Sequence, residues 1–124
     1  MSVIAKTKCV ILIADGKPDR AGDMLNIEKI KLPKFDVPVY LDTFGRPDRV
    51  VGFAELKKEK NEVWADISFF RNVWDLPLFP CASGKILERN PNNHFSIEGA
   101  VIESVSLSTI GNADERIKPI KVSK

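Results

Sequence analysis

Ser96 and His94 are the two residues whose chemistry could make this chain an enzyme. They stand at the start of the stretch His94–Gly111, and His94 is the only histidine among the 124 residues. A serine hydroxyl is a weak nucleophile until a neighbouring base takes its proton, and histidine is well suited to that task near neutral pH. Residues two apart in a strand point to the same face with their backbones about 7 Å apart, which makes this hydrogen bond awkward. We therefore expect His94 to be an ordinary residue at the end of a loop or of a strand.

The other reactive side chains favour structural roles. Cys9 begins an apolar run, as a small core residue would, and Cys81 follows a proline in a predicted loop. One histidine and two separated cysteines do not supply the ligands of a zinc site. The segment Asp15–Asp19 (DGKPD) is predicted to be a turn, because a calcium loop of the EF-hand kind needs more acidic positions. With no glycine-rich phosphate loop and no other catalytic motif, the sequence predicts no metal and no cofactor.

Composition limits the partners that the protein can have. The chain holds 19 basic and 17 acidic residues, and this net charge of +2 argues against nucleic acid or a membrane surface as partner. The longest apolar run, Cys9–Ala14, is too short to span a bilayer, and Met1–Lys8 lacks the apolar region of a signal peptide. We expect one domain over residues 1–124.

Apolar patterns predict strands over much of the chain. Val3–Ala14 is rich in β-branched residues, and Val37–Leu41 is a second strand whose Pro38 indicates a sheet edge or a strand start. His94–Gly111 is predicted to be one long strand, or two strands joined by a kink at Gly99.

A hairpin is predicted from Val50–Lys57 and Glu62–Phe69. In its second strand every other residue is apolar, which is the period of a half-buried antiparallel strand. The apolar face consists of Val63, Ala65, Ile67 and Phe69.

The remaining segments are predicted to be loops or irregular. Met24–Leu32 is either a short helix or irregular, and Cys81–Leu87 is a short strand or a turn. Asp42–Asp48 and Glu88–Asn93 are predicted loops. We expect a mainly β fold, a single compact antiparallel β-barrel or sandwich with at most one or two short helices.

Phe70–Pro80 is too apolar for a solvated loop and too rich in proline for a helix. One interpretation is a segment that covers the end of the core. The alternative is a partner-binding flap, since exposed aromatic clusters mark interaction sites. The basic tail 116–124, which alternates apolar and basic residues, could pair as an edge strand or lie on a partner. The candidate contacts of the flap are Phe69, Phe70, Trp74, Leu78 and Phe79.

Three passages together resemble the prohead maturation proteases of tailed bacteriophages, whose fold is that of the herpesvirus assemblin proteases. They are DRAGDMLN (Asp19–Asn26), VPVYLDTFGRPDRVVGFAELKKEKNEVWADISF (Val37–Phe69) and FSIEGAVIESVSLSTIGNADERI (Phe95–Ile117). Their order and spacing carry the resemblance, which covers roughly residues 8–117. The chain is shorter than family members, which generally carry helices between the hairpin and the serine strand.

The resemblance implies a catalytic serine at Ser96 and a catalytic histidine in the loop after the first short strand. Thr43 stands in the histidine's place, with Asp42 before it. Threonine does not accept a proton near neutral pH, and an ordinary aspartate is a weak base. Glu98 occupies the place of the family's glycine, so the backbone donors for an oxyanion are also altered.

These departures predict a protease-like fold without its catalytic base, used as a capsid decoration or auxiliary head protein. Its expected partner is the major capsid protein, and its location is the virion, after synthesis in the host cytoplasm. Self-association as a homo-oligomer stays open. One alternative is an active, compact prohead protease that uses Ser96 with His94, and Glu103 as the acid implied by the resemblance. The other is a β-barrel adaptor in the neck or tail.

Overall fold

Strands dominate the secondary structure of this computed structural model, which describes residues 2–43, 46–73, 77–112 and 114–122. The mainly β class is confirmed, and the short helix considered over Met24–Leu32 is reduced to one 3-10 turn, η1 (Ile27–Lys29). The strands are β1 (Ala5–Ile13), β2 (Ile30–Lys31), β3 (Val37–Thr43), β4 (Arg46–Glu59), β5 (Glu62–Phe69), β6 (Phe79–Asn90) and β7 (Asn93–Ser108).

These strands form one mixed sheet with the order β1-β5-β4-β3-β7-β2, and β6 pairs with the other side of β7. β3 runs parallel to β7, with Val39 opposite Val105, and β2 also runs parallel to β7. β1 and β6 are edges that do not pair with each other, so the sheet is not closed. The prediction of an all-antiparallel arrangement is therefore wrong, and no closed barrel forms. Alternation within each strand predicts which residues are buried but carries no information about which strands become neighbours.

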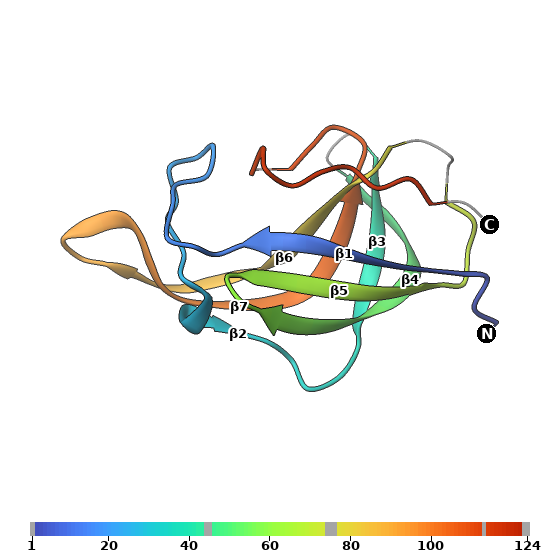
Figure 1. The fold of residues 1–124 in the computed structure, drawn as a ribbon, viewed down its shortest axis with the longest axis horizontal. Helices are drawn as coiled ribbons and strands as arrows, with labels where there is room; N and C mark the ends of the chain where they lie inside the picture. Colours follow the sequence, from blue (N-terminus) through green and yellow to red (C-terminus); the bar gives the residue numbers. More distant parts are fainter. Residues whose placement is uncertain (1, 44–45, 74–76, 113, 123–124) are drawn as a thin grey trace.

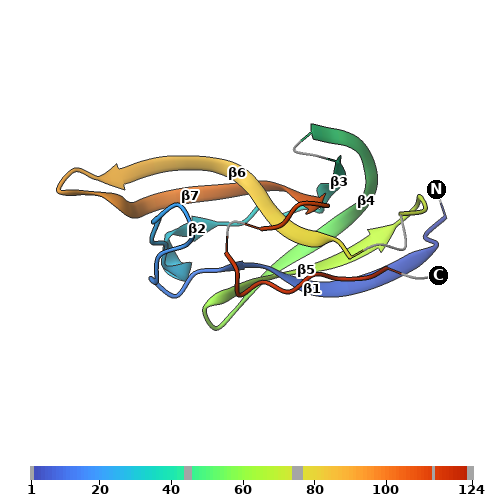
Figure 2. The ribbon, with the colours of Figure 1, turned by 90° about the horizontal axis from the view of Figure 1, so that it is seen from above.

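The core lies inside the curve of this sheet, which brings β6 and β7 opposite β1 and β5 (Figures 1 and 2). The predicted apolar face of β5 is confirmed, because all four of its residues are fully buried. Val39 and Leu41 of β3 and Val105 and Leu107 of β7 complete the centre with no exposed surface. Burial of each such side chain contributes about 1.5–3 kcal/mol.

Pro38 lies in an interior strand, although its presence also suggested an edge. The pairing of β3 with β7 begins only at Val39. On that side of β3, Pro38 therefore has no paired residue to which it would have to donate a backbone hydrogen bond, and proline has no N–H to donate. On the other side Pro38 lies opposite Phe53 of β4. The alternative prediction, a position near a strand start, is the correct one.

The β6–β7 hairpin is longer than the sequence predicted. β6 continues to Asn90, so the loop expected over Glu88–Asn93 shrinks to a turn at residues 91–92. Polar residues such as Arg89 belong to the strand because they pair with β7. Their polarity alone had favoured a loop. The hairpin extends beyond the rest of the sheet (Figures 1 and 2). The loop expected over Asp42–Asp48 is likewise shortened, because β3 ends at Thr43 and β4 begins at Arg46.

The C-terminal segment folds back onto the core. Ile120 and Leu78 exchange two backbone hydrogen bonds of 2.7 Å, and Ile117 and Val122 are buried. The apolar residues of the predicted partner-binding tail are therefore used within the chain, while Lys118 stays on the surface. In the part of the chain that is described, no helix has the length and apolarity needed to cross a membrane.

Candidate functional site

Ser96 lies near the start of β7, where its hydroxyl donates to Oε1 of Glu98 at 3.4 Å. Glu98 also accepts from Nδ2 of Asn90 at 3.1 Å and pairs with Nζ of Lys29 at 3.4 Å. The hydrogen bond from Asn90, helped by Lys29, holds the pKa of Glu98 below its usual range. A carboxylate with a lowered pKa is a weaker base, so Glu98 is poorly suited to activate Ser96.

His94 is turned to other partners. It is exposed, and its ring lies edge-on against Phe95 with the ring centroids 6.3 Å apart. Its backbone carbonyl accepts from Nη1 of Arg89 at 2.9 Å. Within the described residues no hydrogen bond joins His94 to Ser96, so the dyad that they could make is not formed.

Glu103 lies too far from Ser96 to act beside it. Glu103 is exposed on β7, seven residues beyond Ser96, a separation of roughly 20 Å at the usual rise per residue of a strand. At that distance it cannot orient a base beside the serine. Thr43 ends β3 opposite Arg46, and its side chain lies outside the described part of the chain.

The Ser96 hydroxyl contributes little to stability in this arrangement. We expect Ser96→Ala to lower the free energy of unfolding by less than about 1 kcal/mol, because one long hydrogen bond is lost and Glu98 keeps Asn90 and Lys29. Glu98→Ala should lower the free energy of unfolding by more, because it removes the contacts with Ser96, Asn90 and Lys29 together. Urea denaturation of both variants measures the difference, and the reverse order of the two costs would contradict this network.

The predicted flap divides between core and surface. Phe69 and Leu78 have no exposed surface, so the prediction that they contact a partner is wrong. Phe70 and Phe79 are half-buried, and the ring of Phe70 lies 5.5 Å from that of Phe53. Trp74 lies outside the described residues. Phe69 belongs to β5, whereas the interpretation of Phe70–Pro80 as a cover for the end of the core fits the buried Leu78.

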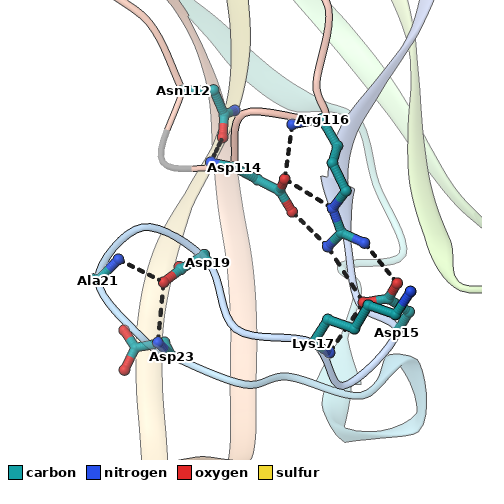
Figure 3. Close-up of polar contacts among 8 residues, drawn as sticks. All are labelled: Asp15, Lys17, Asp19, Ala21, Asp23, Asn112, Asp114 and Arg116. Carbon is teal, nitrogen blue, oxygen red and sulfur yellow. Dashed lines mark hydrogen bonds and ion pairs between the residues drawn. The ribbon is translucent and has the colours of Figure 1, made fainter.

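An arginine joins two turns from opposite ends of the chain (Figure 3). Nη1 of Arg116 donates to Oδ2 of Asp15 at 2.7 Å, and Nη2 donates to Oδ2 of the buried Asp114 at 2.8 Å. The Arg116 hydrogen bond lowers the pKa of Asp15 to about 2, and it also lowers the pKa of Asp114. Sequence reasoning placed Asp15 in a turn but had no local signal for this partner.

Asp19 uses its carboxylate to fold its own loop. Oδ1 accepts from the backbone N–H of Ala21 at 2.9 Å and of Asp23 at 3.0 Å (Figure 3). Asp23 in turn pairs with Arg89 of β6 at 2.8 Å, which ties the loop to the hairpin. No group of three or more His, Cys, Asp and Glu side chains in the described ranges is arranged to hold a metal ion.

An apolar cavity of about 290 Å³ opens between the edge strands β1 and β6. Ile11–Ile13 line it from β1, residues 81–86 from β6, and Ile97 and Ile102 from β7. Lys17 and Asp114 lie at its polar part. The carboxylates beside the cavity are engaged in hydrogen bonds or ion pairs, so this arrangement is suited to binding rather than to proton transfer. Sequence reasoning did not find the cavity, because it depends on which strands form the sheet edges.

Both cysteines are free thiols that burial keeps protonated. Burial raises the pKa of Cys9 to about 12 and the pKa of Cys81 to about 11. Because the thiolate is the reactive form, we expect iodoacetamide to modify the folded protein at least about tenfold more slowly than the urea-unfolded protein near neutral pH. Intact mass spectrometry over time measures both rates. Fast modification of Cys81 in the folded protein would show that its thiol is ionised or accessible.

Comparisons with protein-family models, with curated proteins and with solved structures gave no match to this chain.

Proposed function

We propose that this protein is a non-catalytic structural component of a tailed-bacteriophage particle, an auxiliary or decoration protein that binds the major capsid protein. Three passages of the sequence support this through their resemblance to prohead maturation proteases. The observation that carries the non-catalytic part is the contact of Ser96. Its hydroxyl donates to Glu98, whose pKa is lowered, and not to a base that could take its proton.

A structural role requires accessible surface more than a nucleophile. The sheet has free edges at β1 and β6. On β6 the apolar side chain of Ile86 has 44% of its surface accessible and lines the cavity beside this edge. Exposed apolar residues on a free sheet edge are typical of a surface that binds another protein.

The proposal is tested by mixing the protein with shells assembled from the major capsid protein of the phage that encodes it. We expect stoichiometric co-sedimentation with the shells and no cleavage of the capsid protein on a gel. Ser96→Ala should bind as the unmodified protein does, because the hydroxyl takes no part in binding.

Two results would replace the proposal. Cleavage that disappears in Ser96→Ala would identify an active prohead protease. Absence of binding to shells, together with co-purification with necks or tails and not with empty heads, would identify an adaptor. Each alternative therefore has its own positive signal.

A further inference from the structure

We propose that the free edge of β6 over residues 82–86 accepts an extended segment of the partner protein as an additional strand, with an apolar side chain of that segment in the adjoining cavity. This inference rests on the proposed function for the identity of the partner, the major capsid protein. It adds the surface that binds and the chemistry of the segment that is bound.

The outer edge of β6 is unoccupied along this stretch. β6 pairs with β7 only, and residues 82–86 make no other backbone hydrogen bond in the described ranges. In an antiparallel strand the N–H and C=O groups of alternate residues point to opposite edges, so this edge presents unpaired donors and acceptors. Residues 84–88 are all exposed, which leaves room for an incoming chain.

The chain already uses the start of this strand to hold an extended segment. Leu78, directly before β6, pairs in antiparallel fashion with Ile120 through two hydrogen bonds of 2.7 Å. Asn112 of the same C-terminal segment donates from Nδ2 to the carbonyl of Pro80 at 2.6 Å. A partner strand at residues 82–86 would continue along β6 where the C-terminal segment leaves it.

The cavity beside this edge determines which side chains fit. Its lining is mainly apolar, with Ile11 and Leu12 on one side and Ile86 and Ile102 on the other. Its volume of about 290 Å³ accommodates a bulky apolar side chain. In strand addition, backbone hydrogen bonds supply affinity and pockets for alternate side chains supply specificity. The cavity therefore selects an apolar residue that points inward from the added strand.

The charges that line the cavity favour acidic residues beside that apolar anchor. Asp23 and Asp114 are paired with Arg89 and Arg116. Asp19, which also lines the cavity, accepts hydrogen bonds from two backbone N–H groups of its own loop. Lys17 and Lys85 also line the cavity, and among the described residues no ion pair involves either of them. The bound segment is thus an extended stretch with an apolar residue facing the cavity and a carboxylate near each lysine.

The test compares two neighbouring substitutions in the full-length protein, with assembled major-capsid-protein shells as the probe. Ile86→Asp places a charge in the cavity wall, whereas Leu87→Asp places the same charge on an exposed neighbour that does not line the cavity. We expect Ile86→Asp to weaken binding to shells at least about tenfold and Leu87→Asp to change it less than about threefold. Thermal unfolding by circular dichroism checks that both variants are folded. Hydrogen–deuterium exchange should show slower exchange of the amides of residues 82–86 on shells.

The other outcomes are distinct. Equal binding of Ile86→Asp and the unmodified protein, or protection only outside residues 82–86, would overturn the strand addition and leave the proposed function intact. Failure of the unmodified protein to bind shells would overturn the proposed function and this partner with it. A dimer in sedimentation that Ile86→Asp dissociates would show that a second copy occupies the edge, and it would also overturn the inference.

Discussion

Phe69→Ala is expected to lower the free energy of unfolding by about 3–5 kcal/mol, the usual cost of truncating a buried phenylalanine. Phe69 has no exposed surface and lies opposite Ala5 of β1 and Gly52 of β4. These small neighbours cannot fill the space that the ring would leave. Since a domain is typically stable by only about 5–15 kcal/mol, the variant should unfold at a much lower urea concentration. Tryptophan fluorescence during urea denaturation measures the shift.

Phe53→Ala is the matched control for this substitution. Phe53 lies on β4 next to Gly52, but 46% of its surface is exposed and it faces away from the core, against Phe70. We expect a cost below about 1 kcal/mol, because mainly one aromatic contact is lost. Similar costs for the two substitutions would contradict the assignment of Phe69 to the core and reopen its role at a partner surface.

Arg116→Met is expected to lower the free energy of unfolding by about 2 kcal/mol at neutral pH, through the loss of charge-assisted hydrogen bonds. It leaves the buried Asp114 without its ion-pair partner and frees Asp15 from the C-terminal segment. Arg116→Lys is the control, because lysine keeps the charge but cannot bridge two carboxylates with a planar group. Arg116→Lys should therefore lower the free energy of unfolding by less than Arg116→Met does. A full recovery would show that the charge alone matters.

The same substitution should change how stability depends on pH. The pKa of Asp15 is lowered from 3.8 to about 2, and that of Asp114 is lowered too. A carboxylate with a lowered pKa stabilises the folded state above its unfolded pKa, and this contribution is lost as the pH falls through the folded pKa. The unmodified protein should therefore lose stability between about pH 4 and about pH 2. Arg116→Met should lose less over that range, and parallel curves would show that Arg116 does not set these pKa values.

Local patterns predicted the faces of strands well and their neighbours poorly. The alternation in β5 identified its buried residues, because the side-chain period of a strand depends on nothing beyond the strand itself. The parallel pairing of Val39 with Val105 had no such signal, since it is decided by packing of the whole sheet. The polar residues at the end of β6 suggested a loop, and only their pairing with β7 makes them a strand.

The candidate site shows the same limit. Ser96 and His94 drew attention because they are close in sequence, yet each has a different partner, Glu98 and Phe95. Arg116 and Asp15 are 101 residues apart, and the sequence of neither turn predicts the ion pair between them. Aromatic content marked Phe69 as a surface contact, although its apolar neighbours in β5 placed it equally well in the core.

The parallel pairing of β3 with β7 has a consequence for how the chain reaches its structure. Val39 meets Val105, and Ala5 of β1 meets Phe69, each pair more than half the chain apart. The hairpins β4–β5 and β6–β7 need only local contacts and are expected to close first, because forming the distant pairings costs more chain entropy. Folding should thus be slow for a protein of this size, in the millisecond-to-second range typical of sheets with distant pairings. Until the distant strands meet, the edge of β6 and the apolar face of β5 stay open to other chains.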